Sequence, residues 1–422
     1  MLMRHTTYSL SALLLAAVAI TGCYDDTCSS VMTYEKWTPI YADMADLRTT
    51  SILPENSRDL VQPGKVYVHG DYLLINEVRQ GIHIINNADP SSPTPVAFLP
   101  IRGNVDLAVH SGHLYADQVK DLLVFDFQNP AAPTLVHRAA DALPGLGQPD
   151  SDGRVIVDYH REEVTEEVDC TRQEMMAAEP VIIMNGDDNL RVDFVSAQIG
   201  SDATSIGGSM SRFTVANGHL YTIGDSDMEV FDLSLVQQPT KVNTVSVGSD
   251  IETVFPYGDQ LFVGSMSAMF IMDASTASAP TLRATFEHAT ACDPVFVAGN
   301  HAYVTLRTGN ACGGWLNQLQ IIDVSNLDQP QLMRTVNLSN PHGLSVRNKK
   351  LYIGEGVNGL TVFDIPDPIA PQFSEQISHH HAYDIISASD THIIVIGDDG
   401  LYQYSTLNST ALQELSRITV SR

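Results

Sequence analysis

The chain alternates between short apolar runs and turns rich in Gly, Asn, Asp and Pro along most of its length. Within the runs, β-branched and aromatic residues alternate with polar ones, which is the pattern of half-buried β-strands. No run inside these repeating segments keeps a helical period. The pattern therefore predicts an all-β protein built from short strands joined by tight turns.

One of these runs recurs seven times and ends on the same kind of residue. Its copies include LLVFD at 122–126, MEVFD at 228–232, LQIID at 319–323 and LTVFD at 360–364. The last positions of the seven copies, from Asn86 to Ser405, are spaced 40, 106, 41, 50, 41 and 41 residues apart. A proline follows that position by seven residues in six of the copies. Such a period indicates an internal structural repeat.

Each copy follows a second apolar stretch that leads through a turn into a run such as Leu114-Tyr115 or Leu351-Tyr352. One unit of about forty residues thus holds four short strands, which is the size of a β-propeller blade. Seven units can close into a ring, and closure removes exposed edge strands. The repeat predicts a seven-bladed β-propeller of four-stranded antiparallel blades.

The units resemble the LVIVD-repeat β-propeller family of bacterial and archaeal surface proteins. That family's blades read Gly-Leu-x-Ile-Val-Asp-Val-Ser-Asp-Pro-x-x-Pro, and LQIIDVSNLDQP at 319–330 and GLTVFDIPDPIAP at 359–371 are similar to it. The resemblance covers roughly residues 55–420 and supports a propeller domain over 55–422. It implies a fold and no particular activity.

Two places depart from the period. The gap of 106 residues predicts a β-rich insertion at about 139–203, between blades 2 and 3, in which RVIVDYHREEVTEEVDC at 154–170 forms long strands. NGDDN at 185–189 is typical of a hairpin turn. The gap of 50 residues places extra residues, TGNACGGWLN at 308–317, inside blade 5. Insertions in repeat proteins gather on one face, which is often the binding face.

The N-terminal segment is predicted to be a targeting signal. An apolar run at 13–20, too short to span a membrane, ends at Ile20-Thr21-Gly22-Cys23. This resembles the bacterial lipobox, in which the Cys is lipidated. Residues 1–22 are therefore expected to be the signal peptide of a lipoprotein. Cys23 is expected to carry its acyl chains, including palmitate. An ordinary secretory peptide is the alternative. Tyr24 after the Cys favours the outer membrane, on its periplasmic or surface face.

Residues 23–54 are expected to form a tether, with DLRTTSIL at 46–53 as an extra strand. That strand would close the ring against the last blade, displacing or flanking LSRITV at 415–420.

The four remaining cysteines suggest disulfides in an exported protein. Three pairings exist; Cys292 with Cys312 is favoured because both fall within one repeat, which leaves Cys28 with Cys170.

The net charge of −27 argues against nucleic acid or an anionic bilayer as the main partner, because like charges repel. The membrane is then reached through the N-terminal lipid only.

No hydrolase elbow, zinc-protease motif, P-loop or dinucleotide fingerprint occurs in the sequence. The clusters Asp225-Ser226-Asp227 and Asp398-Asp399-Gly400 read as hairpin turns rather than calcium loops. The Asp that ends each third strand reads as structural, because its side chain can bond the backbone of the following turn. Its copies are Asp126, Asp232, Asp273, Asp323 and Asp364.

Propeller ligands generally bind at the mouth of the central channel, where the innermost strands begin. By repeat register, the candidate ligand-binding residues there are Lys65, Asp106, Arg212, Glu252, Asp293, His342, His381 and Asp384. No cofactor is expected; a divalent metal held by His342 and His381 with Asp106 or Asp384 is the alternative. The triplet His379-His380-His381 cannot turn all three rings to one ligand, because neighbouring strand residues point to opposite faces.

The sequence therefore favours an envelope binding or scaffold module for another envelope protein or a surface polymer. A hydrolase or lyase acting at the channel mouth is the alternative, and metal-dependent ligand binding there is a further one. An enzyme is the less favoured reading because no catalytic constellation is visible in the spacing.

Overall fold

The computed structural model describes residues 29–169, 183–184, 205–207, 211–289, 294–307, 316–408 and 411–421. Over these residues the chain is β-structure with one short helix, as the alternation predicts. The chain divides into two compact units, residues 1–37 with 161–185 and residues 38–160 with 186–422.

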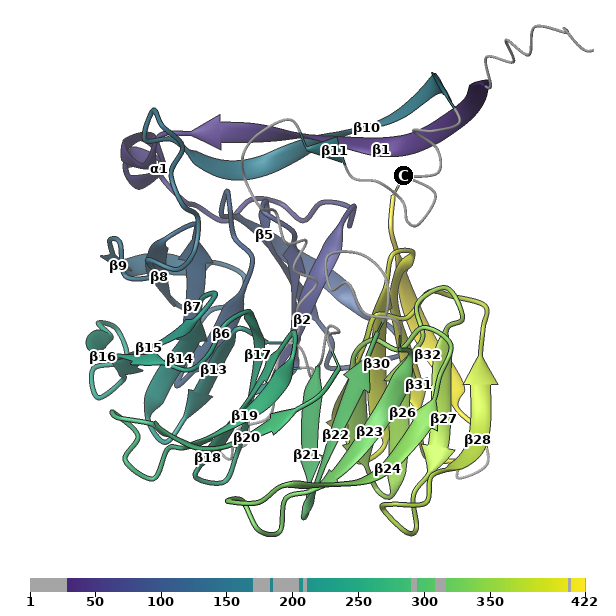
Figure 1. The fold of residues 1–422 in the computed structure, drawn as a ribbon. Helices are drawn as coiled ribbons and strands as arrows, with labels where there is room; N and C mark the ends of the chain where they lie inside the picture. The colour runs from purple at the N-terminus through teal and green to yellow at the C-terminus, as the bar shows by residue number, and fades with distance from the viewer. Residues whose placement is uncertain are drawn as a thin grey trace, which may run out of the picture. The chain divides into compact units, whose positions relative to one another are not determined.

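Eight sheets are found in the described residues, and seven of them, all in the larger unit, follow the repeat as antiparallel meanders (Figure 1). The first sheet contains β2 (Pro63–His69), β3 (Tyr72–Glu77), β4 (Gly81–Asn86) and β5 (Thr94–Pro100), with β12 (Ser205–Gly207) paired along β2. The second contains β6 (Leu107–His110), β7 (His113–Gln118), β8 (Asp121–Asp126) and β9 (Thr134–Ala139). The third contains β13 (Phe213–Ala216), β14 (His219–Ile223), β15 (Asp227–Asp232) and β16 (Thr240–Ser246).

The other four sheets repeat this order. The fourth contains β17 (Ile251–Tyr257), β18 (Gln260–Ser265), β19 (Ala268–Asp273) and β20 (Thr281–Glu287). The fifth contains β21 (Val295–Ala298), β22 (His301–Leu306), β23 (Gln318–Asp323) and β24 (Gln331–Asn337). The sixth contains β25 (Leu344–Arg347), β26 (Lys350–Gly354), β27 (Leu360–Asp364) and β28 (Gln372–Ile377). The seventh contains β29 (Asp384–Ser389), β30 (His392–Gly397), β31 (Gly400–Ser405) and β32 (Gln413–Thr419).

The first strand of each sheet contacts the first strand of the next, from β2 through β25 to β29. The last sheet then meets the first, because β29 contacts β12 and β30 contacts β2. Second and third strands are almost fully buried, whereas fourth strands such as β16 and β24 are largely exposed. Burial that falls from the axis outward is the arrangement of a β-propeller, in which sheets pack face to face.

The smaller unit contains residues 29–37 of the long strand β1 (Ser29–Ala42) and residues 161–169 of the long strand β10 (Val155–Asp169). With β11 (Ile183–Met184) they form a sheet of order β10-β1-β11. The guanidinium of Arg161 lies 3.7 Å above the ring of Trp37, and Lys36 Nζ lies 2.6 Å from Glu162 Oε1. The long strand predicted within 154–170 is confirmed for its described residues.

The strand predicted at 46–53 is wrong, because α1 (Met44–Thr49) occupies that segment. Met44 and Leu47 are three residues apart and both buried, in one apolar cluster with Val119. Arg48 forms a bidentate pair with the buried Asp121 carboxylate at 2.9 and 2.7 Å, which orients the helix. No helix in the described residues is long and apolar enough to cross a membrane.

Other residues join the end of the last sheet to the segment before the first sheet. Val420, just after β32, forms a parallel bridge with Leu60, and Ser421 N donates to Leu60 O at 2.8 Å. LSRITV at 415–420 therefore keeps its place in the last sheet. The hairpin predicted at 185–189, the extra residues 308–315 and all five cysteines lie outside the described residues.

Candidate functional site

One end of the sheets collects the segments that do not repeat. In an antiparallel meander, the start of the first strand, the second-to-third turn and the fourth-to-first connection all lie at the same end. Residues 140–148, which follow β9, therefore lie at the end where the first strands begin, with the turn between β14 and β15 and the turn between β30 and β31. We call this end of the seven sheets the mouth face. Both acidic clusters predicted as turns, at 225–227 and 398–400, are found there.

Lys65, Asp106 and Arg212 come together as predicted, but as a buried structural group. Lys65 Nζ pairs with the Asp106 carboxylate, which also accepts the backbone N–H groups of Arg212 and Phe213 at 2.8 Å each. Lys65 and Asp106 are each 2% exposed. Burial lowers the pKa of Lys65 to about 8, although the Asp106 carboxylate opposes this shift. The group joins the first three sheets and leaves little surface for a ligand.

A second buried carboxylate next to this group was not predicted. Asp117 in β7 accepts the side-chain N–H of Asn104 at 2.7 Å and the backbone N–H groups of Val105 and Asp106 at 2.9 and 2.8 Å. Burial raises the pKa of Asp117 to about 6, against the hydrogen bonds that lower it. The carboxylate holds the start of β6 in place, which is a structural task.

His342 and His381 also come together, between the sixth and seventh sheets. Their ring centroids are 6.3 Å apart, and the ring of Tyr383 lies 5.1 Å from His342 and 4.2 Å from His381. Burial lowers the pKa of His381 and holds that of His342 well below its usual range. Both imidazoles are therefore neutral near pH 7. Asp384 is buried nearby and packs against Gly343.

In the described residues, these two histidines form neither the catalytic contact nor the metal site that the alternative functions require. His381 Nε2 lies 3.7 Å from Asp398 Oδ2, beyond the hydrogen-bond reach that a general base and its carboxylate need. Within the described ranges, no group of three or more His, Cys, Asp or Glu side chains could hold a metal ion. The Asp106 carboxylate proposed as a third ligand pairs with Lys65 instead.

The other histidines of the triplet point elsewhere, as predicted. His380 stacks on Tyr402 with centroids 4.2 Å apart, and His379 Nε2 lies 3.3 Å from Glu414 Oε2. Glu252 is half-buried as the second residue of β17. Asp293 lies outside the described residues, as does Cys23.

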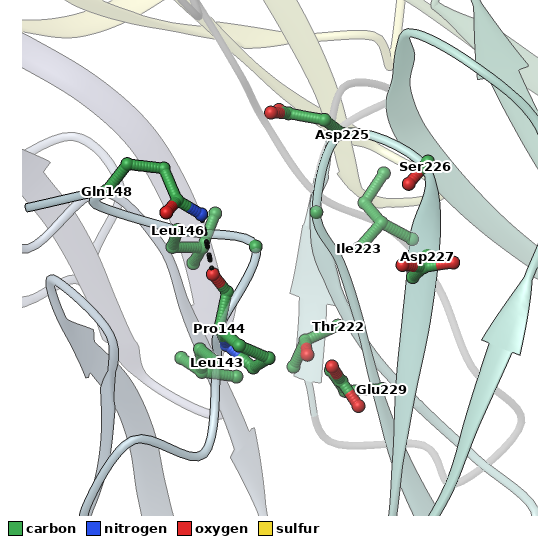
Figure 2. A pocket seen from close by; sticks show the side chains of 12 residues that line it. Leu143, Pro144, Leu146, Gln148, Thr222, Ile223, Asp225, Ser226, Asp227 and Glu229 are labelled. Atoms are coloured by element: carbon green, nitrogen blue, oxygen red, sulfur yellow. Dashed lines mark hydrogen bonds between the residues drawn. The ribbon is translucent and has the colours of Figure 1, made fainter.

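A cavity of about 280 Å³ opens on the mouth face between the second and third sheets. Figure 2 shows its two walls, a loop on one side and strand residues on the other. The loop wall consists of residues 143–146 and Gln148, and the strand wall of residues 222–227 and Glu229. None of these residues was among the predicted candidates.

The strand wall is the polar end of a face that is otherwise apolar. Leu220 and Phe231 pack against the core of the second sheet. Because side chains alternate along a strand, Thr222 and Glu229 lie on the same face, one step nearer the turn. Thr222 pairs with Glu229 in register. The apolar contact between the sheets therefore gives way to a polar space.

Thr222 is exceptional among the seven second strands. In each sheet, one residue of the second strand pairs with the residue three positions before the end of the third strand, and in the third sheet this residue is Thr222. In the other six sheets the residue at this position is apolar: Ile75, Ala116, Val263, Val304, Ile353 and Val395. Thr222 is 2% exposed, and its hydroxyl has no hydrogen-bond partner in the described part of the chain. This break in the repeat is the sequence signal that could have located the cavity.

The loop wall is fixed on the second sheet. Leu143 N donates to Lys120 O at 3.0 Å, and Asp141 N donates to Asp121 Oδ1 at 2.9 Å. Gly147 has φ +60, and a Cβ at that position would lie 2.1 Å from Val119 Cγ1. Only glycine combines this conformation with so close an approach. The cavity is thus preformed by packing and hydrogen bonds on both sides.

Comparison with solved structures supports the fold. A protein from Lactobacillus plantarum is 13% identical with a TM-score of 0.54, covering 85% of this chain and 97% of that chain. A candidate 6-phosphogluconolactonase from Bacteroides fragilis is 11% identical with a TM-score of 0.51, covering 85% and 96%. At these identities the likeness shows the fold alone.

Comparison with curated protein sequences gives no match. The family model of the LVIVD repeat matches residues 103–141, 290–338 and 342–378. These matches overlap the second, fifth and sixth sheets. The resemblance predicted from the repeat is confirmed for these three ranges, each of which matches the LVIVD repeat.

Proposed function

We propose that the seven sheets form a closed, seven-bladed β-propeller over residues 55–422, interrupted near 139–203. The contacts of β29 with β12 and of β30 with β2 support closure, as does the bridge between Leu60 and Val420. Residues 1–22 would be the signal peptide and 23–54 the tether, of which α1 is held by Asp121.

We further propose that this propeller is a lipid-anchored binding or scaffold module of the cell envelope, for another envelope protein or a surface polymer. The observation that carries the proposal is the cavity formed by the non-repeating loop at 143–148 against the turn of the third sheet. Two of the charged groups predicted at the channel mouth, Lys65 and Asp106, neutralise each other in a buried contact. Recognition then falls to the parts that do not repeat.

The alternative of a hydrolase or lyase has less support. The buried histidines at the mouth, His342 and His381, lie beside Tyr383 rather than in hydrogen-bond contact with a carboxylate. A general acid or base would need such a partner or a pKa near the working pH, whereas burial lowers both imidazole pKa values.

Site-specific photo-crosslinking in intact envelopes tests the binding function. A photoreactive residue replacing Asp225, which is exposed on the mouth face, should form an adduct with one protein or polymer that mass spectrometry identifies. The same residue replacing the exposed Asp328, in the turn between β23 and β24 at the opposite end, is the matched control. Equal adducts at both positions, or none at Asp225, would contradict a binding role for the mouth face.

The anchor is tested by Cys23→Ser. Without a thiol to acylate, the protein should leave the membrane fraction, because each buried methylene contributes about 0.8 kcal/mol to anchoring. Cell fractionation and metabolic labelling with a palmitate analogue measure the loss, and Cys28→Ser is the control. Retention of the Cys23→Ser protein in membranes would overturn the lipoprotein assignment.

A further inference from the structure

The cavity between the second and third sheets contains an unsatisfied hydrogen-bonding group. The Thr222 hydroxyl is buried, lines the cavity and has no partner in the described part of the chain. A buried hydroxyl without a hydrogen bond costs free energy that a valine at the same place would avoid. Valine occupies the same register in three other sheets, at Val263, Val304 and Val395. The Thr222 hydroxyl therefore lacks a hydrogen bond that a bound ligand could supply.

The three carboxylates of the cavity differ in how far they are neutralised. Glu229 accepts the Thr244 hydroxyl and the Lys241 ammonium, each at 2.6 Å. Asp225 lies 3.7 Å from the guanidinium of Arg212. The half-buried Asp227 carboxylate makes no hydrogen bond or ion pair with the residues that the structure describes. The strand wall of the cavity therefore contains a carboxylate, Asp227, that no described residue neutralises, and the unpartnered hydroxyl of Thr222.

Size and wall chemistry restrict what this cavity can bind. A volume of about 280 Å³ lies below the roughly 300–1,000 Å³ of sites for drug-sized ligands, so the cavity suits one side chain. On the loop side, Pro144 is exposed and Leu146 is half-buried, so these two residues supply apolar surface, whereas Leu143 is buried in the core (Figure 2). A flexible alkyl stem with a charged end matches both walls, since such side chains bury the stem and direct the charge to polar groups.

Resting on the proposed binding function, we propose that this cavity is the socket for a lysine side chain of the protein partner. The ammonium donates to the Asp227 carboxylate and the Thr222 hydroxyl, and the stem lies against Pro144 and Leu146. A lysine fits better than an arginine because a compact ammonium needs no pair of coplanar acceptors, whereas a guanidinium does. The net charge of −27 favours encounter with a basic partner.

Isothermal titration of the full-length chain in detergent tests the socket. The probe is Nα-acetyl-lysine N-methylamide, with the norleucine, Nε-acetyl-lysine and arginine analogues as comparators. We expect a dissociation constant on the order of 1 mM for the lysine probe. Binding should weaken with added salt, and the uncharged analogues should not bind.

Two variants localise the site. Asp227→Asn should weaken the lysine probe about tenfold, since it removes the charge partner and keeps the shape. Thr222→Val should weaken it several-fold, and this variant keeps the fold because valine is the residue of three equivalent positions. Asp328→Asn changes the net charge equally, lies at the opposite end of the sheets and should change nothing. Equal binding of the norleucine analogue, or an unchanged affinity in Asp227→Asn, would overturn the proposal.

The crosslinking experiment separates the two proposals. If the partner still crosslinks at position 225 in Asp227→Asn and Thr222→Val with unchanged yield, the lysine socket is wrong and the binding function stands. If the lysine probe binds but no adduct forms at the mouth face, the cavity accepts a lysine side chain, but the partner-binding function fails and with it the assignment of that lysine to a protein partner.

Discussion

The aspartate that ends the third strand shows how one residue type can serve the fold in two ways. Asp232, Asp273 and Asp323 each accept the backbone N–H two residues later, at 2.6, 2.9 and 2.8 Å. These hydrogen bonds lower the pKa of all three carboxyls. In the sixth sheet the residue two positions on is Pro366, which has no N–H, and Asp364 pairs with Lys350 at 2.7 Å instead. The turn hydrogen bond predicted for these residues is confirmed for Asp232, Asp273 and Asp323 and is absent at Asp364 among the described contacts.

The buried pair of Lys65 and Asp106 predicts an unusual dependence of stability on pH. The pKa of Lys65 is about 8 in the fold against 10.5 for an ordinary lysine, so the unfolded chain binds more protons between these values. The free energy of unfolding should therefore rise from this group as pH increases from about 8 to about 10.5. Asp117, with a pKa of about 6, is already ionised there and adds no slope.

Asp106→Asn should destabilise the protein by about 3–5 kcal/mol at pH 7, because Lys65 is left charged and buried without its partner. The pKa of Lys65 then falls further, since the Asp106 carboxylate no longer raises it. The difference in the free energy of unfolding between the natural chain and Asp106→Asn should therefore become smaller between pH 7 and pH 10. Urea unfolding at a series of pH values measures it. A deficit that stays constant or grows with pH would show that the ammonium is not the group left without compensation.

At the scale of the element, neighbouring sheets are joined by tyrosines of the second strands. The Tyr115 hydroxyl donates to Val236 O and the Tyr221 hydroxyl to Ala277 O, each at 2.8 Å. Both acceptors lie in the turn between the third and fourth strands of the next sheet. Phe262 occupies the same register in the fourth sheet, so the ring packs there without a hydroxyl. The aromatic ring therefore packs between the sheets with or without a hydroxyl, and the tyrosine hydrogen bond adds to this packing.

Tyr221→Phe should therefore fold and lose about 1 kcal/mol of stability, because the Ala277 carbonyl loses its donor. Tyr257→Phe, at an exposed tyrosine, is the matched control and should leave the urea midpoint unchanged. Hydrogen exchange should also show faster opening of the turn at 274–280 in Tyr221→Phe alone. An unchanged midpoint and unchanged exchange would mean that water replaces the tyrosine at no cost.

Some features of the elements could not be read from the sequence. In all seven sheets the register between the third and fourth strands shifts two residues before the strand ends, for example between Val230 and Phe231. Such a bulge increases strand twist and depends on backbone geometry that has no single residue signature. Helix α1 was missed because six residues are too few for a helical period to appear.

For the whole molecule, the repeat predicted the sheets and their order along the chain. Register alone brought Lys65 next to Asp106, yet it could not show that the two would neutralise each other. That outcome depends on how closely the first strands approach, a tertiary distance. The cavity was missed because one wall, at 143–148, belongs to no repeat and so had no register. Thr222 was visible as a polar residue at an apolar position, and only its burial shows why this matters.

The junction between the last sheet and the first contains a polar pair where other sheets have an apolar contact. Gln403 in β31 and Asn87 after β4 exchange two hydrogen bonds, at 2.9 and 2.8 Å, and both are buried. The residues equivalent to Gln403 in the other six sheets are apolar: Ile84, Val124, Val230, Ile271, Ile321 and Val362. A reciprocal amide pair is satisfied only when the last sheet meets the first in this register. The pair therefore specifies which edges join, as buried polar pairs do in other assemblies.

A double-mutant cycle tests this reading of the closure. Gln403→Leu and Asn87→Val should each cost about 2 kcal/mol, because each leaves one buried amide without its partner. The double variant should cost clearly less than both together, with a coupling of roughly 1–3 kcal/mol measured by urea unfolding. The exposed pair of Asn217 and Asp259, 3.3 Å apart between the third and fourth sheets, is the control cycle and should couple by less than about 0.5 kcal/mol. Strictly additive losses at Gln403 and Asn87 would mean that apolar packing alone closes the ring, and that the amide pair gives no preference for this register over another.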